Sequence, residues 1–169
     1  MFTNIFGVQR QNITLGFPAH LNKFELSQAF NHAFKEIIQH PILYEVVETG
    51  PVMENVMEGG DVNVLSFPTP LWHAEDGGRY IGTACGVVTR DPDTGRINIG
   101  TYRVQVIDEK TCASYISNGK QGRIHRDKYL AAGKPCPMAI IVGIDPVTYL
   151  SARYTLSDTV PELDWAGGL

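Results

Sequence analysis

The sequence predicts an α+β fold, in which helices and antiparallel strands occupy separate parts of the chain. A helical pattern of apolar residues runs from 21 to 39, a hairpin pattern spans 77–108, and a second helical pattern lies at 122–132. Helices that are segregated from hairpin-connected strands are typical of this class. The 169 residues are enough for one domain, or for one domain with an appended element, to bury a core.

Residues 21–39 predict an amphipathic helix, because apolar side chains recur there at mostly three- and four-residue intervals. Those side chains are Leu21, Phe24, Leu26, Phe30, Phe34, Ile37 and Ile38. Pro41 ends the helix, since proline has no backbone N–H to donate. Residues 42–65 hold two β-prone pieces, ILYEVVET and DVNVL, around PVMENVMEGG, whose proline and paired glycines break regular structure. We interpret this stretch as a connector with short strands.

Residues 77–108 predict an antiparallel hairpin. Two β-rich runs flank residues 91–95 (DPDTG), which supply a proline, short polar side chains and a glycine for positive φ. In a regular second strand Asn98 and Arg103 point to opposite faces, because side chains alternate along a strand. A bulge at Gly100 would bring the two side chains together.

The remaining residues predict shorter elements. TCASYI (111–116) is a strand, SNGKQG is a glycine-punctuated loop, and residues 122–132 form a helix that Gly133 closes. The apolar run CPMAIIVGI (136–144) predicts a buried strand, and Asp145 and Pro146 begin a short helix, VTYLSA. The last stretch, 154–169, reads as loop, and its apolar end AGGL suggests a truncated chain.

Composition narrows the classes of function. Hydrophobic residues make up 43% and charged residues 19%, which is typical of a packed globular body. A net charge of −4, with only 14 lysines and arginines, argues against a nucleic-acid partner. No apolar run reaches the roughly 20 residues of a membrane span, and the N-terminus lacks the layout of a signal peptide, so we expect no membrane and a cytoplasmic location. Three widely spaced cysteines, Cys85, Cys112 and Cys136, predict reduced and buried thiols.

Five polar side chains are candidates for chemistry: Asn98, Arg103, Gln121, His125 and Glu162. Arg103 is either a surface arginine on a half-exposed strand or a planar cation that binds a carboxylate or phosphate at two points. Asn98 is either an amide that caps backbone groups or a ligand for a hard cation. No histidine has a second histidine at ligand spacing, so we interpret His125 as an ordinary core or surface residue.

Four blocks of sequence carry more specific information. They are PTPLWHAEDGGRYIGT, TRDPDTGRINIGTYRVQV, VGIDPVTYLSA and DTVPELDWAGGL. In this order and at these separations they resemble the prenylated-FMN-binding core of the UbiD family of reversible decarboxylases. The resemblance implies a split β-barrel flavin-binding domain over residues 60–169, preceded in residues 1–59 by part of an α/β region and a connector.

The resemblance also implies a metal site that bridges the protein and the flavin phosphate. Asn98 falls on the family's amide ligand, and Glu162 falls on its carboxylate ligand in the VPE segment. Gln121 stands where the family usually has histidine. Oxygen ligands predict a hard ion, Mn²⁺ or Mg²⁺, and the glutamine should weaken binding or favour Mg²⁺. K⁺ is a further cofactor that the resemblance allows.

Further positions fall on the family's prenylated-FMN site. Arg103 falls on the active-site arginine that faces the substrate carboxylate and is the implied catalytic residue. The implied cofactor-binding residues are Thr83, Ile99, Gly100, Arg103, Lys120, Ala152, Arg153 and Tyr154. The resemblance implies an aromatic or α,β-unsaturated carboxylic acid as substrate, and a prenyl-flavin synthase as the supplier of the cofactor.

The family's proton-donating acidic residues and its oligomerisation domain are expected beyond residue 169. Three hypotheses therefore stay open. The chain is a fragment of a decarboxylase, a small subunit that completes its site with a partner chain, or a non-catalytic flavin-binding module. For the full enzyme the resemblance implies a homo-oligomer or a partner subunit.

Overall fold

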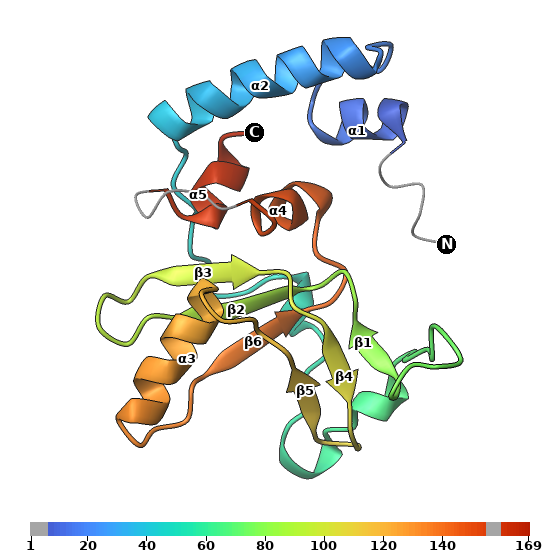
Figure 1. The fold of residues 1–169 in the computed structure, drawn as a ribbon, viewed down its shortest axis with the longest axis vertical. Helices are drawn as coiled ribbons and strands as arrows, with labels where there is room; N and C mark the ends of the chain where they lie inside the picture. The colour runs from blue at the N-terminus through green and yellow to red at the C-terminus, as the bar shows by residue number, and fades with distance from the viewer. Residues whose placement is uncertain (1–6, 155–159) are drawn as a thin grey trace. The chain divides into compact units, whose positions relative to one another are not determined.

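The computed structural model describes residues 7–154 and 160–169, which fall into two compact units. Unit 1 comprises Met1–Tyr44 and Ile144–Leu169, and unit 2 comprises Glu45–Gly143. Figure 1 shows the helices of unit 1 and the strands of unit 2. Each unit has an apolar cluster of its own.

Unit 1 consists of helices. They are α1 (Val8–Thr14), α2 (Lys23–Gln39), α4 (Pro146–Ser151) and α5 (Glu162–Gly167). α2 confirms the helix predicted at 21–39. It begins with a capping box, in which Asn22 Oδ1 accepts from the backbone N–H of Phe24 and Glu25 at 2.9 and 3.1 Å, and Glu25 accepts in return from the Asn22 N–H. α4 is also as predicted, because Asp145 accepts from the N–H groups of Val147 and Thr148.

The core of unit 1 forms around Trp165, which is fully buried on α5. The rings of Phe30, Phe34 and Tyr154 lie 6.2, 5.4 and 5.9 Å from the Trp165 ring. The prediction of a loop over 154–169 is therefore wrong for residues 162–167, since burial of Trp165 stabilises a short helix there. Residues 155–159 lie outside the described part of the chain.

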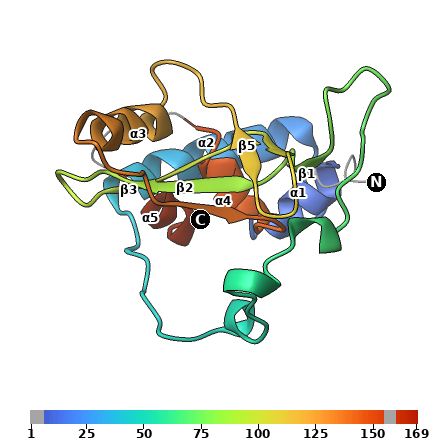
Figure 2. The ribbon, with the colours of Figure 1, turned by 90° about the horizontal axis from the view of Figure 1, so that it is seen from below.

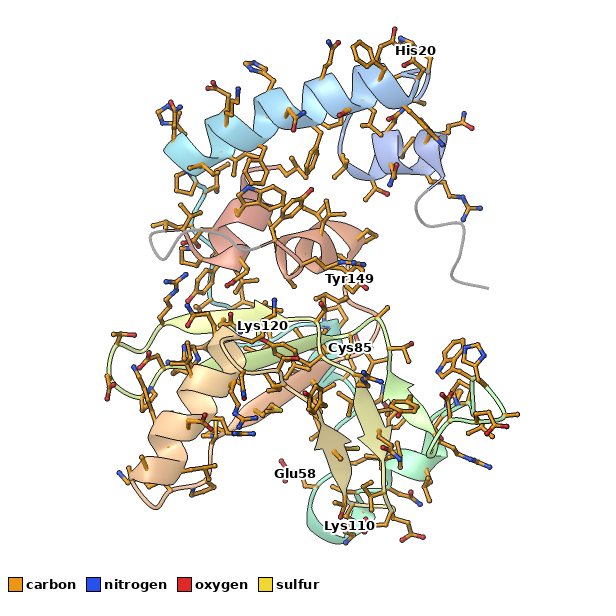
Figure 3. All side chains as sticks on the ribbon, viewed as in Figure 1. His20, Glu58, Cys85, Lys110, Lys120 and Tyr149 are labelled. Carbon is orange, nitrogen blue, oxygen red and sulfur yellow. The ribbon has the colours of Figure 1, made fainter. Side chains whose placement is uncertain are left out.

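Unit 2 contains two antiparallel three-stranded sheets, with the orders β1-β4-β5 and β3-β2-β6. The elements are β1 (Tyr80–Gly82), β2 (Gly86–Arg90), β3 (Ile97–Gly100), β4 (Val104–Val106), β5 (Cys112–Ser114), α3 (Gln121–Ala131) and β6 (Met138–Ile141). The cluster of Cys85, Val87 and Val104 draws on both sheets and joins them. Figure 3 labels Cys85 within this region.

The predicted hairpin is confirmed as β2 and β3. Gly95 has φ +74°, and the Asp91 N–H donates to the Arg96 carbonyl at 2.8 Å across the turn. The predicted continuous second strand is wrong, because the chain leaves one sheet after Gly100 and enters the other at Val104. Residues 101–103 are outside both ladders, so strict alternation does not relate Asn98 to Arg103.

Two further predictions need correction. The strands predicted at 42–49 and 61–65 are absent: 42–49 form no regular element, and 3₁₀ helices follow at Pro51–Met53, Gly59–Asp61 and Val64–Ser66. β-prone side chains do not make a strand unless a neighbouring strand pairs with them. β6 is a strand, as predicted, but its residues are exposed, with Ile140 and Ile141 each 37% accessible. It lies at the edge of its sheet and, among the described strands, pairs only with β2.

Other predictions for unit 2 are confirmed in outline. β5 covers the centre of TCASYI, and α3 matches the helix predicted at 122–132, with Gly133 at φ +66° after its end. The three cysteines are free, but only Cys85 is fully buried. Figure 2 shows α3 on one side of the β3-β2-β6 sheet. Across the described residues, no helix is both long enough and apolar enough for a bilayer crossing.

Candidate functional site

Thr83 and Arg103 line a single cavity of about 360 Å³ in unit 2. The ladder between β1 and β4 explains this, because Gly82 lies opposite Val104 in an antiparallel pair. Thr83 follows Gly82 and Arg103 precedes Val104, so the two residues lie at the same end of this antiparallel pair. Both side chains are exposed. The structure therefore brings together two residues that the sequence assigned to cofactor and substrate.

The rest of the cavity wall comes from Trp72, His73, Asp76 and Tyr80. A tight turn holds this loop, since the His73 N–H donates to Asp76 Oδ2 at 2.9 Å and the Asp76 N–H donates to the His73 carbonyl at 3.1 Å. A guanidinium, two aromatic rings and a few polar groups suit a planar organic anion.

Asn98, Ile99 and Gly100 form most of β3 and are all buried. Asn98 is 5% exposed, and its Nδ2 has no hydrogen-bond partner within the described residues. An unpaired buried amide costs about 1–3 kcal/mol, so a ligand that engages Asn98 would recover that cost. Rotation of the amide presents its carbonyl oxygen in the same place. Ile99 points to the opposite face of the strand.

The ring of Tyr102 joins the end of β3 to the start of α3. A Cβ atom added to Gly100 would overlap this ring, and one added to Gly122 would lie 3.0 Å from its Cε2 atom. Because the ring contacts both glycines, α3 begins at Gln121 beside the end of β3. Lys120 precedes it as an exposed residue at the helix N-terminus (Figure 3).

His125 is a core histidine, one of the two alternatives that the sequence left open, and is 2% exposed. Its Nδ1 lies 3.0 Å from Thr89 Oγ1, and its Nε2 lies 3.7 Å from an Asp91 carboxylate oxygen. Burial lowers the pKa of His125, while the nearby Asp91 carboxylate opposes that shift. Lys128 donates to Asp91 and lowers the pKa of that carboxyl to about 2. These contacts fix α3 against the hairpin.

The other predicted site residues belong to unit 1. Ala152 ends α4 and is buried, while Arg153 and Tyr154 are exposed and line a second cavity of about 580 Å³. The Arg153 guanidinium lies 5.8 Å from the centre of the Tyr149 ring. Glu162 begins α5 and is 7% exposed, so a carboxylate is buried here.

The described residues, 7–154 and 160–169, contain no group of three or more His, Cys, Asp or Glu side chains placed to hold a metal. The predicted ligands are two amides and one carboxylate, so they do not require such a group. The Asn98 amide, whose Nδ2 has no partner in the part described, suits the oxygen-rich site that a hard ion needs once rotation presents its carbonyl oxygen.

Sequence reasoning missed several residues of these sites. Trp72, Asp76 and Tyr80 lie in the block PTPLWHAEDGGRYIGT, and their place beside Thr83 was the available signal. No sequence pattern indicated Thr89, because its contact with His125 joins residues 36 positions apart.

Comparison with known proteins gives a consistent picture. A family model described as the UbiD 3-octaprenyl-4-hydroxybenzoate carboxy-lyase Rift-related domain matches residues 45–169. The pyrrole-2-carboxylic acid decarboxylase of Pseudomonas aeruginosa is 31% identical over 160 residues, which are 95% of this chain and 32% of that protein.

Solved structures share the fold. Vanillic acid decarboxylase of Sedimentibacter hydroxybenzoicus, in its closed form, matches with a TM-score of 0.84 at 27% identity, over 98% of this chain and 35% of its own. An evolved dimeric form of the UbiD-class enzyme HmfF from Pelotomaculum thermopropionicum, in complex with prFMN, has a TM-score of 0.83 at 24% identity. The match covers 96% of this chain and 36% of that one. The α+β prediction is thus confirmed, and the chain spans about a third of the length of these relatives.

Proposed function

This chain belongs to the UbiD family, and from that premise we propose that it forms the prenylated-FMN-binding part of a decarboxylase for aromatic or α,β-unsaturated acids. The cavity that joins Arg103 to Thr83 carries the proposal. The relatives named above act on pyrrole-2-carboxylic and vanillic acids, a heteroaromatic and an aromatic acid. The split-barrel domain over residues 60–169, after an α/β region in 1–59, is part of the same proposal.

Arg103 is the proposed carboxylate-binding residue. It projects from the irregular residues between two strands, with its side chain exposed in the cavity. A guanidinium can donate two parallel hydrogen bonds to a carboxylate, which fixes the orientation of an acid as well as its position. The rings of Trp72 and Tyr80 provide flat apolar walls for an aromatic substrate.

Asn98, Gln121 and Glu162 are the proposed ligands of Mn²⁺ or Mg²⁺, which would hold the phosphate of prenylated FMN. Asn98 supports this assignment because its amide is buried and its Nδ2 is unpaired within the described residues. Glu162 would contribute the charged oxygen. Thr83, Ile99, Gly100, Lys120, Ala152, Arg153 and Tyr154 are the proposed cofactor-binding residues, and K⁺ is a further proposed ion. When bound, prenylated flavin supplies an electron sink for loss of CO₂.

The residues of this chain would therefore bind and orient the cofactor and the acid substrate. An acidic residue from elsewhere would protonate the product carbon. We propose that this acid comes from the portion that the longer relatives carry beyond the matched third, or from a partner subunit. A prenyl-flavin synthase would load the cofactor. The alternative is a flavin-binding module without activity, which the glutamine at position 121 favours.

Binding of an acid and of its decarboxylated product tests the site in this chain alone. The ¹⁵N-labelled protein is titrated with pyrrole-2-carboxylate or vanillate and, in parallel, with pyrrole or guaiacol. We expect the acids to shift the signals of Arg103 and Thr83 and to bind more tightly than the products. Arg103→Gln should remove that difference, a loss of about tenfold or more for a bidentate charged contact.

Arg79→Gln is the matched control, because Arg79 is exposed in the same unit and lies outside the cavity lining. Equal binding of acids and products by the unaltered chain would overturn the proposed substrate site. The cofactor is tested by producing the chain together with a prenyl-flavin synthase and recording its absorbance and intact mass. A colourless protein of unaltered mass would contradict prenylated FMN binding.

A further inference from the structure

We propose that Thr89 and His125 are positioning residues, which hold Gln121 beside Asn98 so that both side-chain amides can contact one cation. This inference deepens the proposed metal site and rests on it. Neither Thr89 nor His125 is among the proposed ligands.

The sheet places Thr89 directly beside Asn98. The two residues are opposite partners in the β2–β3 ladder, so their side chains project from the same face about 5 Å apart. Both are buried, at 1% and 5% exposure. Asp91 is two residues after Thr89 and shares that face. These residues form a polar layer under α3, which packs against β2 and β3.

The helix provides the other half of the arrangement. His125, 2% exposed, places its Nδ1 3.0 Å from Thr89 Oγ1. Gln121 is four residues earlier in α3, so it lies on the same helical face about one turn toward the N-terminus. The contact between Thr89 and His125 therefore sets where Gln121 lies along β3.

The Asn98 amide lies beside this contact and has an unpaired Nδ2 group in the described part of the chain. Thr89 is the ladder partner of Asn98, and its hydroxyl lies 3.0 Å from His125 Nδ1. His125 therefore fixes α3 against the strand pair that carries the unpaired Asn98 Nδ2 group.

Substitutions that differ by one group test this inference. Thr89→Val removes the hydroxyl at nearly constant volume, Thr89→Ser keeps it, and His125→Leu removes the imidazole. Lys128→Met removes a different contact between α3 and the hairpin, the hydrogen bonds to Asp91, and is the control for general loosening of α3. Binding of Mn²⁺ in the presence of FMN is measured by electron paramagnetic resonance, well below the unfolding temperature of each variant.

We expect Thr89→Val and His125→Leu to weaken Mn²⁺ binding about tenfold or more, as for residues that orient metal ligands. Thr89→Ser and Lys128→Met should stay within about twofold of the unaltered chain. Unchanged binding in Thr89→Val, or an equal loss in Lys128→Met, would overturn the inference.

A second readout needs no metal. In the ligand-free ¹⁵N-labelled chain, the side-chain amide signals of Asn98 and Gln121 should both move in Thr89→Val and stay in place in Lys128→Met. If the unaltered chain binds no Mn²⁺ with FMN, the proposed metal site fails, and these signals still decide whether Thr89 and His125 position the two amides. Unchanged amide signals in Thr89→Val would contradict the positioning role.

Discussion

Lys128 donates to both carboxylate oxygens of Asp91, at 2.7 and 3.0 Å. The pair joins the last turn of α3 to the first residue of the hairpin turn, 37 positions earlier. Lys128 also lies 2.9 Å from Asp93, and His125 lies 3.7 Å from Asp91 on the buried side. Charged side chains therefore attach α3 to the hairpin near the turn. The titration of these side chains determines how the stability of unit 2 depends on pH.

Lys128→Met should raise the pKa of Asp91 from about 2 toward 3.8, because the hydrogen bond from Lys128 is the largest cause of the lowered value. A depressed carboxyl pKa stabilises the folded state above pH 3.8, and that stabilisation is lost as the pH falls toward 2. The variant should lose much of this dependence. Titration of the Asp91 carboxyl carbon by NMR measures the shift, and Lys134→Met, an exposed lysine beyond the end of α3, should leave it unchanged.

His125 should make the free energy of unfolding depend on pH near neutrality. Burial lowers its pKa from 6.5, so the unfolded chain binds a proton more readily than the folded chain. The folded state is therefore most favoured above pH 6.5 and loses stability as the pH falls below that value. Asp91 opposes the shift, while Lys128 and Arg96 reinforce it.

Urea unfolding between pH 5 and 8 checks this expectation. His125→Gln should flatten the pH dependence over that range, whereas His32→Gln, at an exposed position on α2, should leave the slope as it is. A slope that is the same in all three proteins would contradict the assignment to His125.

Local sequence patterns were enough to predict the elements whose cause is local. α2 follows from a regular apolar stripe and ends at Gln39, shortly before Pro41, and the β2–β3 hairpin follows from the turn residues 91–95. The start of α4 follows from Asp145 in the same way. Each of these depends on residues within a few positions of one another, which a sequence displays directly.

Long-range contacts explain the failures. The predicted strand is interrupted between β3 and β4 because these two strands pair in different sheets. α5 forms because Trp165 packs against α2. The family resemblance identified Thr83 and Arg103, which share a cavity, but no pattern indicated that Thr89 pairs with Asn98 and contacts His125. Strand register and helix docking decide those relationships, and neither can be read from spacing.

Gly100→Ala should destabilise unit 2, by about 1–3 kcal/mol for an overpacked buried site. The new Cβ atom would overlap the ring of Tyr102, and Val104 follows closely enough to limit movement of the backbone. Chemical denaturation measures the change. Gly60→Ala, where nothing lies within 4 Å of the added atom, is the matched control.

Combining Gly100→Ala with Tyr102→Ala identifies the cause of that loss. If overlap with the ring is responsible, the double variant should be less destabilised than the sum of the two single changes. Additive effects would show that Gly100 is needed for another reason, such as the close approach of its strand partner Val87.

Gln121→His should shift the proposed metal site toward Mn²⁺. An imidazole nitrogen is a softer donor than an amide oxygen, and Mg²⁺ exchanges its oxygen ligands for nitrogen reluctantly. We expect the Mn²⁺ dissociation constant with FMN present to fall about tenfold, which is about 1.4 kcal/mol, with little change for Mg²⁺. Gln105→His is the control, because the Gln105 amide donates to the Gly77 carbonyl at 3.0 Å, away from α3. A parallel change for both ions, or the same shift in Gln105→His, would mean that position 121 does not contact the metal.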